Sequence, residues 1–264
     1  MSMVATEDAI IRVENLTAGY GDTPVVDSIS FWVKPGEVFV ILGGSGSGKS
    51  TILKCMIGIY KPESGKVLIG GQDIVSAEGE HRFQILNRIG VMYQKGALFG
   101  SMTLLENVRL PLEEFTELPP PAMDLIATLK LELVGLHGFE DKMPSELSGG
   151  MQKRAAIARA MALDPEILFL DEPSSGLDPI TSAEVDQLVL NLARNLGMTF
   201  VIVSHDLAST YMIADRVVIL DTKTKGIAAT GSPMDLRDRS QSPWVRQFLN
   251  RQVTPESNKR AHSP

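Results

Sequence analysis

The chain has 264 residues, 44% of them hydrophobic and 22% charged, so it is long and apolar enough to fold around a sizeable core. Its net charge of −7 argues against a protein that binds nucleic acid through a basic surface, and we expect no nucleic-acid partner.

The chain has one cysteine, and its apolar stretches are short. The single cysteine, Cys55, cannot form an internal disulfide, and it lies in the apolar stretch 52–59, where a buried small side chain is expected. Residues 1–8 lack the pattern of a signal peptide, and no apolar stretch approaches the ~18 residues that would cross a bilayer. If the protein serves a membrane, we expect another chain to span it.

Short apolar runs alternate with segments of helical spacing along the chain. Ile11–Leu16 alternates like a half-buried strand, and helical spacing follows at 50–59 and again at 183–196. Wholly apolar runs predict strands covered on both faces at Val38–Leu42, Ile167–Leu170, Phe200–Val203 and Val217–Leu220. This alternation predicts an α/β fold with a mostly parallel sheet between helices.

The middle of the chain has a different pattern. Helical pieces near 104–110 and 122–134 flank a proline cluster at 119–121, which predicts an inserted helical subdomain at about 97–153. Residues 249–264 are polar and predict a C-terminal tail, so the expected domain spans 11–248.

A glycine-rich segment follows the apolar run 38–42 and precedes a helical stretch. This context indicates a phosphate-binding loop, in which backbone N–H groups and the helix N-terminus hold phosphate, Lys49 reaches the outer phosphates and the Ser50 hydroxyl ligates magnesium. A flexible Gly/Ser turn would explain neither Lys49 nor Ser50. The nucleotide-binding candidates of this loop are Gly43, Gly44, Ser45, Gly46, Ser47, Gly48, Lys49, Ser50 and Thr51.

Polar side chains also follow two of the predicted buried strands. Asp171 suits a residue that orients magnesium, and Glu172 suits the base that polarises the attacking water. The alternative is a helix cap before the segment that follows Pro173. His205 follows the strand 200–203, where a role in sensing the γ-phosphate competes with an ordinary structural histidine.

Leu147–Gln152 precedes a helical stretch predicted at 153–163. Ser148, Gly149 and Gly150 would leave free N–H groups at a helix start, a second candidate anion site, although Ser148 also suits an ordinary N-cap.

Together these motifs resemble those of the ATP-binding-cassette ATPases, over residues 11–248. The resemblance implies a phosphate-loop NTPase core of the RecA type with an N-terminal antiparallel β part. It also implies that Tyr20 stacks on adenine, that Gln94 touches magnesium and water, and that Asp178 lies in a loop exchanged across the dimer. His205 would be the switch histidine, and Lys49, Glu172 and His205 would carry catalysis.

In that family the Leu147–Gln152 segment faces the phosphate loop of a second subunit. The resemblance therefore implies a head-to-tail homodimer that encloses two ATP molecules, with Mg²⁺ bound at Ser50, Gln94 and Asp171. A phosphate-loop kinase would leave Leu147–Gln152 without a purpose.

A narrower resemblance rests on 93–112, 143–151 and 178–181. These segments are similar to the ATPase of phospholipid-transporting systems that maintain lipid asymmetry, although Ser175–Asp178 keeps the general family form. This implies an integral membrane permease, which holds the chain at the cytoplasmic face of the inner membrane, with periplasmic lipid-binding and small regulatory subunits. The apolar side chains of Gly96–Leu112 suit a docking surface for a short permease helix, although they also suit the packed core of the helical subdomain. Importers of amino acids and other small solutes share the framework, and a soluble ABC ATPase is a further alternative.

Overall fold

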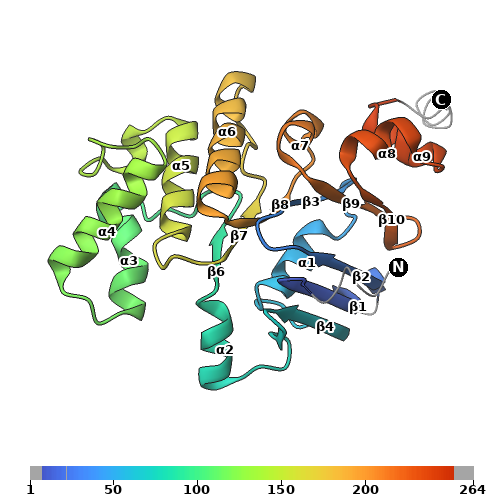
Figure 1. The fold of residues 1–264 in the computed structure, drawn as a ribbon, viewed down its shortest axis with the longest axis horizontal. Coiled ribbons are helices and arrows are strands. Elements are labelled where there is room, and N and C mark those ends of the chain that lie inside the picture. The colour runs from blue at the N-terminus through green and yellow to red at the C-terminus, as the bar shows by residue number, and fades with distance from the viewer. Residues whose placement is uncertain (1–7, 22, 253–264) are drawn as a thin grey trace.

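A mostly parallel sheet forms the centre of the computed structural model, which describes residues 8–21 and 23–252. Its strands lie in the order β10-β9-β3-β8-β7-β6, all parallel except β10 (Figure 1). Their bounds are β3 (Val38–Gly43), β6 (Ile89–Met92), β7 (Ile167–Asp171), β8 (Thr199–Val203), β9 (Arg216–Asp221) and β10 (Gly226–Gly231). The predicted parallel sheet is confirmed.

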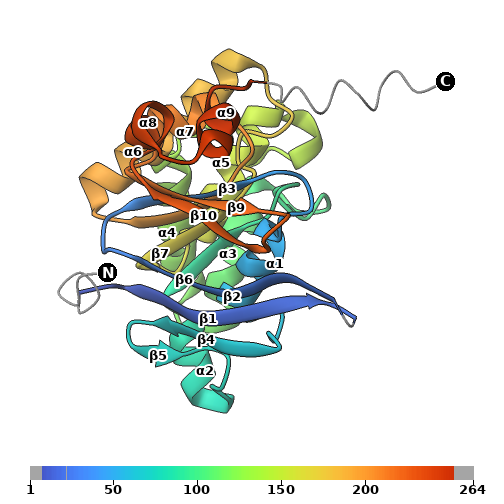
Figure 2. The same cartoon turned by 90° about the vertical axis from the view of Figure 1, so that its right-hand side faces the viewer.

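A second, antiparallel sheet lies below the first, with helix α1 between the two layers (Figure 2). Its strand order is β2-β1-β4-β5. The bounds are β1 (Ile11–Tyr20), β2 (Thr23–Val33), β4 (Ser64–Ile69) and β5 (Gln72–Asp73). This is the antiparallel part that the family resemblance implied.

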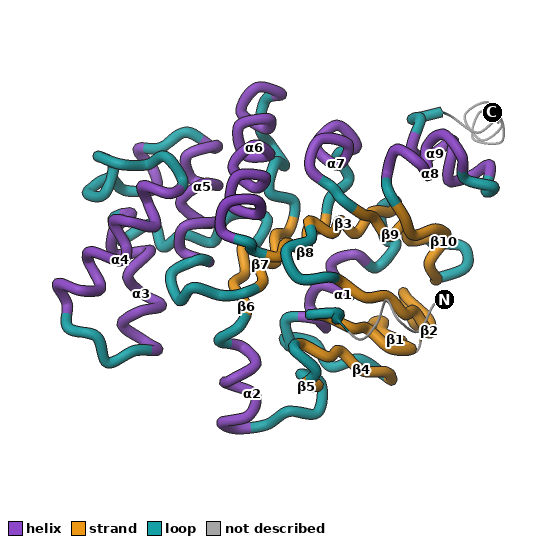
Figure 3. Tube along the Cα trace, viewed as in Figure 1, coloured by secondary structure: helices purple, strands orange, loops and turns teal. Residues whose placement is uncertain are grey.

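Helices cover the upper face of the parallel sheet, and α3, α4 and α5 pack together at one end of the molecule (Figures 1 and 3). These three helices lie in the chain between β6 and β7. The bounds are α1 (Lys49–Met56), α2 (Gly79–Leu86), α3 (Leu104–Phe115), α4 (Pro120–Leu133), the 3₁₀ helix η2 (Pro144–Glu146), α5 (Gly149–Ala160), α6 (Pro179–Leu196), α7 (Leu207–Ile213), α8 (Pro233–Arg239) and α9 (Pro243–Leu249). Within the described residues, every helix is too short or too polar to cross a bilayer.

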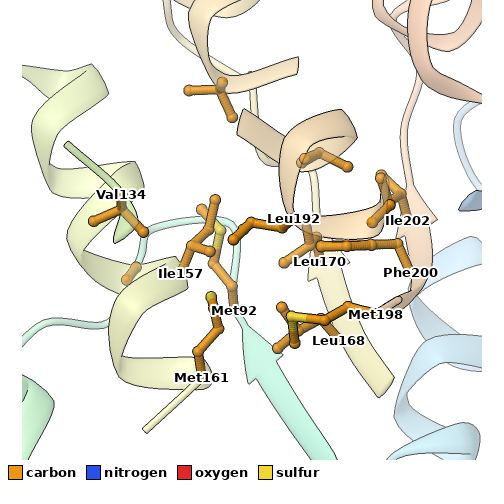
Figure 4. Packing of buried hydrophobic residues seen from close by; sticks show 14 of the residues in the cluster. Met92, Val134, Ile157, Met161, Leu168, Leu170, Leu192, Met198, Phe200 and Ile202 are labelled. Atoms are coloured by element: carbon orange, nitrogen blue, oxygen red, sulfur yellow. The ribbon is translucent and has the colours of Figure 1, made fainter. Parts of the chain in front are cut away.

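The parallel sheet separates two hydrophobic cores. Along β3, Val40 faces the helices of the upper core, whereas Phe39 and Ile41 face α1 and the antiparallel sheet. In the upper core, Phe200 of β8 lies in one cluster with Ile157 of α5 (Figure 4). Burial on both faces explains why these strands have continuous apolar sequences.

Two element boundaries differ from the sequence-based expectation. Helix α5 begins at Gly149, four residues before the predicted start, because Ser148 caps it. The predicted tail began at 249, but Leu249 is buried in α9, and residues 253–264 lie outside the described part of the chain.

Candidate functional site

The glycine-rich loop runs from the end of β3 into α1, at the C-terminal edge of the parallel strands. Gly48 has a φ of 94°, and a Cβ atom there would lie 2.5 Å from Cγ1 of Val26. Only glycine fits this conformation and this space. The loop therefore passes close against β2 at Gly48, in a conformation that requires glycine.

Lys49 is the first residue of α1, and its side chain folds back over the loop. Its Nζ donates to the carbonyl oxygens of Gly43, at 2.9 Å, and Gly44, at 3.1 Å. Burial lowers the pKa of Lys49, while the charges of Glu172 and Asp171 raise it. The ammonium thus lies within the field of both carboxylates and beside the loop that would hold phosphate.

Asp171 ends β7, beside β8 and one strand away from β3. Its Oδ1 atom is buried and accepts no hydrogen bond from the residues that the structure describes. Burial raises the pKa of Asp171, as does the charge of Glu172, while Lys54, Lys153 and Lys49 lower it. An orphaned buried carboxylate oxygen calls for a ligand.

Glu172 and His205 meet although they follow different strands. The Nδ1 atom of His205 lies 2.7 Å from Oε2 of Glu172, with Glu172 buried and His205 largely exposed. Glu172 adopts a φ of 51°, a conformation that costs a non-glycine residue of order 1–3 kcal/mol. The helix-cap alternative for Asp171 and Glu172 is excluded, because the next helix begins at Pro179 and is capped by Asp178.

The second candidate anion site lies at the start of α5. Ser148 is exposed, and its Oγ accepts a hydrogen bond from the backbone N–H of Met151, so the N-cap interpretation is correct. Gly149 borders a cleft that is also lined by Gln94 and Ser175, and none of the described residues of 43–51 borders it. The glycine-rich loop of the same chain therefore lies outside the cleft that Gly149 borders.

Three further candidate residues lie on other segments of the chain, and of these Gln94 lines the cleft that Gly149 borders. Gln94 is exposed after β6. Tyr20 is 55% exposed at the end of β1, with Lys54 6.0 Å from its ring centroid. Asp178 accepts hydrogen bonds from the hydroxyl of Thr181 and from the N–H groups of Thr181 and Ile180, which lower its pKa. In this chain Asp178 caps α6.

One buried cation near the site escaped the sequence analysis. Lys153 of α5 is only 8% exposed, and its Nζ donates to the carbonyl oxygens of Gln94 and Glu172. The helical spacing indicates its burial, because position 153 lies on the same helix face as Gly150, three residues before it, and Ile157, four residues after it, and both are buried. Cys55 is fully buried, as predicted, and burial raises its pKa to about 12.

Residues 26–175 match the family model described as ABC transporter. The chain belongs to the ABC transporter family and is an ATPase. The fold agrees, because a dimeric bacterial ABC transporter cassette superposes with a TM-score of 0.76 at 31% identity, covering 84% of this chain and 98% of that one. A cassette from Clostridium perfringens, cbiO1, gives a TM-score of 0.81 at 30% identity, with 93% and 97% covered.

Curated relatives of this cassette bear two different cargo names. The "Intermembrane phospholipid transport system ATP-binding protein MlaF" of Haemophilus influenzae is 42% identical, over 91% of this chain and 90% of its own length. The "Probable ribonucleotide transport ATP-binding protein mkl" of Mycobacterium leprae is 41% identical, over 93% of this chain and 70% of its own length. Such similar identities assign the cassette to a transport ATPase family but do not choose a cargo.

Proposed function

We propose that this cassette hydrolyses ATP with Glu172 as the general base and His205 as its orienting partner and γ-phosphate sensor. The observation that carries the proposal is the contact of 2.7 Å between His205 Nδ1 and Glu172 Oε2 at the strand ends that also hold the glycine-rich loop. Glu172 polarises a water molecule, and Lys49 holds the outer phosphates while negative charge builds up on them. Measuring the turnover of Glu172→Gln tests this assignment.

Magnesium fits the donors at this site. Asp171 offers the buried Oδ1 atom, which has no hydrogen-bond partner among the described residues, and Ser50 and Gln94 offer exposed neutral oxygens. Mg²⁺ typically takes only one or two carboxylates from the protein and completes its coordination with phosphates and water. We infer that Asp171, Ser50 and Gln94 hold the ion, which would neutralise phosphate charge when bound.

We infer further that two copies associate head to tail around ATP. Ser148 and Gly149 are exposed at the N-terminus of α5, whose backbone donors, with that of the buried Gly150, suit phosphate, but the cleft that Gly149 borders is not lined by Lys49. A second copy can bring this helix end to the phosphate loop. A related cassette in a post-hydrolysis state bound to ADP and Pi is also dimeric, at 30% identity.

For the permease, we propose a docking surface within Gly96–Leu112. Phe99 is 49% exposed there, yet its loop is fixed, because its backbone N–H donates to Oδ1 of the fully buried Asn107 and its carbonyl accepts from Nδ2. Phe115, the last residue of α3 and outside this segment, packs on Phe83 of α2 with ring centroids 5.8 Å apart. An exposed aromatic side chain on a fixed loop suits the docking of a short helix of a membrane partner.

We propose phospholipid as the cargo, moved between two membranes, with the cassette held at the cytoplasmic face of the inner membrane by its permease. The support is the name of the Haemophilus relative, a phospholipid transport ATP-binding protein, and the alignment over 91% of this chain and 90% of that relative. Periplasmic lipid-binding and small regulatory subunits would complete the system. The test measures the ATPase activity of the cassette–permease complex in the presence of phospholipid vesicles. Stimulation by ribonucleotides or amino acids instead of phospholipid would refute the proposed cargo. Normal function without any permease would favour a soluble ATPase.

A further inference from the structure

Lys153 places a positive charge inside the protein, between segments that the chain separates widely. Its side chain extends from α5, the helix that begins at the exposed Ser148. The ammonium donates to the carbonyl of Gln94, in the loop after β6, and at 3.3 Å to the carbonyl of Glu172, after β7. One side chain therefore connects the candidate anion site, the candidate magnesium loop and the proposed base.

Packing alone does not account for a lysine at this position. Moving an ammonium out of water costs several kcal/mol unless it is well bonded, whereas a methionine would fill similar space without that cost. Burial lowers the pKa of Lys153, and the negative charges of Asp171 and Glu172 raise it. The carboxylates and the two carbonyls together keep a cation here, so its position is coupled to the site.

The backbone of Glu172 needs such support. Its φ of 51° is unfavourable for glutamate, and its N–H is already held by the carbonyl of Val203 on β8, at 2.9 Å. On the other side, the carbonyl oxygen of Glu172 accepts hydrogen bonds from the N–H of Ser175, at 3.1 Å, and from Nζ of Lys153. Glu172 is thus fixed by the sheet on one side and by α5 on the other.

We propose that Lys153 is a positioning residue for ATP hydrolysis. By holding the carbonyls of Gln94 and Glu172 against α5, it transmits the position of the Ser148 end of that helix to the Glu172 carboxylate. Binding of an anion at Ser148 then aligns the base, and loss of that alignment slows the chemical step. The inference rests on the proposed role of Glu172.

The test compares Lys153→Met with Arg154→Met, the next residue of the same helix, whose Nη1 donates to the Val134 carbonyl at 3.4 Å. In the assembled complex we expect Lys153→Met to lower kcat by ~10- to 100-fold, since small misplacements of a catalytic group have effects of this size, while KM for ATP changes less than ~3-fold. Lys153→Arg, which keeps a long cationic donor, should recover kcat to within ~3-fold of wild type. Arg154→Met should retain wild-type kcat.

Two outcomes would overturn the positioning role. One is wild-type kcat in Lys153→Met. The other is a loss of kcat that parallels a loss of unfolding midpoint and of ATP affinity and that Lys153→Arg does not restore. Such a result would mark a purely structural lysine. If Lys153→Met does not fold, Lys153→Gln, which keeps a shorter neutral donor, replaces it, with an intermediate kcat expected and wild-type kcat contradicting the proposal.

A double-mutant cycle with Glu172→Gln, measured in single turnovers, identifies the route. If Lys153 acts through Glu172, adding Lys153→Met to Glu172→Gln lowers the residual rate no further. An equal loss in both backgrounds would refute action through Glu172. Wild-type turnover of Glu172→Gln would instead refute the proposed base, so the two failures are distinguishable.

Discussion

The Nδ1 atom of His205 lies 2.7 Å from Oε2 of Glu172, and the register of the sheet produces this contact. Asp171, at the end of β7, pairs with Val203, at the end of β8, so the residues that follow both strands emerge side by side. Parallel neighbours bring distant parts of a chain to one edge in this way. The pairing of β7 with β8 therefore sets where the segments that carry Glu172 and His205 begin.

Replacement of Glu172 tests the general base. Glu172→Gln keeps the size of the side chain but removes its charge, so turnover should fall by ~10²-fold or more, as is typical for general bases. ATP binding should persist, and a closed dimer should accumulate with ATP. Steady-state ATPase and size-exclusion chromatography measure both effects, and wild-type turnover would remove Glu172 from the mechanism.

His205 offers a second test of the same pair. Its side chain is exposed, so His205→Ala should fold normally, yet turnover should fall by ~10-fold or more because Glu172 loses its partner. His137→Ala is the matched control, since His137 is also exposed and lies near a glutamate, Glu140, at 3.7 Å. Equal activities of the two variants would contradict a role for His205.

How much the sequence predicts depends on whether a feature is local. The buried strands are predictable because the apolar run 38–42 must be covered on both faces, and the parallel sheet is confirmed. The start of α5 is harder to predict. Gly149 and Gly150 are poor helix formers, but the Ser148 cap outweighs their low helix propensity.

Contacts between distant residues are the harder part. Lys153 has the residue type of a solvent-exposed helix position, and its partners lie 59 and 19 residues away. The aromatic pair of Phe83 and Phe115 depends on how α2 meets α3. No local pattern specifies such pairs, because tertiary packing creates them.

Lys49 provides a test of nucleotide binding. Lys49→Ala removes an ammonium that now donates to two loop carbonyls and would donate to phosphate. Hydrogen bonds to charged groups contribute about 1.5–3 kcal/mol, so Kd for ATP should rise by ~10- to 100-fold in calorimetry. Lys66→Ala, at an exposed site on β4, is the control, and unchanged affinity in Lys49→Ala would refute the phosphate role.

Mixing two inactive variants tests whether the nucleotide site is shared between copies. A Ser148→Arg chain keeps its phosphate loop, and a Lys49→Ala chain keeps its α5 terminus. In either homodimer both nucleotide sites contain the changed residue, so neither homodimer has an intact site. A mixed dimer should contain one intact site, formed by Lys49 of the first chain and Ser148 of the second. ATPase activity should therefore reappear on mixing, and its absence, or full activity of the Ser148→Arg homodimer, would refute the head-to-tail arrangement.

Crosslinking at Phe99 tests the docking surface. The native thiol of Cys55 is fully buried, and burial raises its pKa to about 12, so this thiol should react slowly. Cys55→Ala removes the thiol without leaving an unpaired hydroxyl. In that background, Phe99→Cys places a thiol on the loop fixed by Asn107, and Leu196→Cys places one at a similarly exposed position at the end of α6. Both chains are then assembled with permeases that carry single cysteines on successive cytoplasmic loops.

We expect Phe99→Cys to crosslink to one permease loop and Leu196→Cys to none. Because Lys153 bonds the Gln94 carbonyl, the 96–112 segment should move with α5 when ATP binds, so the crosslinking yield should differ with and without ATP. If no loop reacts with Phe99→Cys while copurification shows an intact complex, the permease docks elsewhere. If the yield at Phe99 does not change with ATP, the surface is a docking site that does not respond to the nucleotide, and the proposed coupling through Gln94 is wrong.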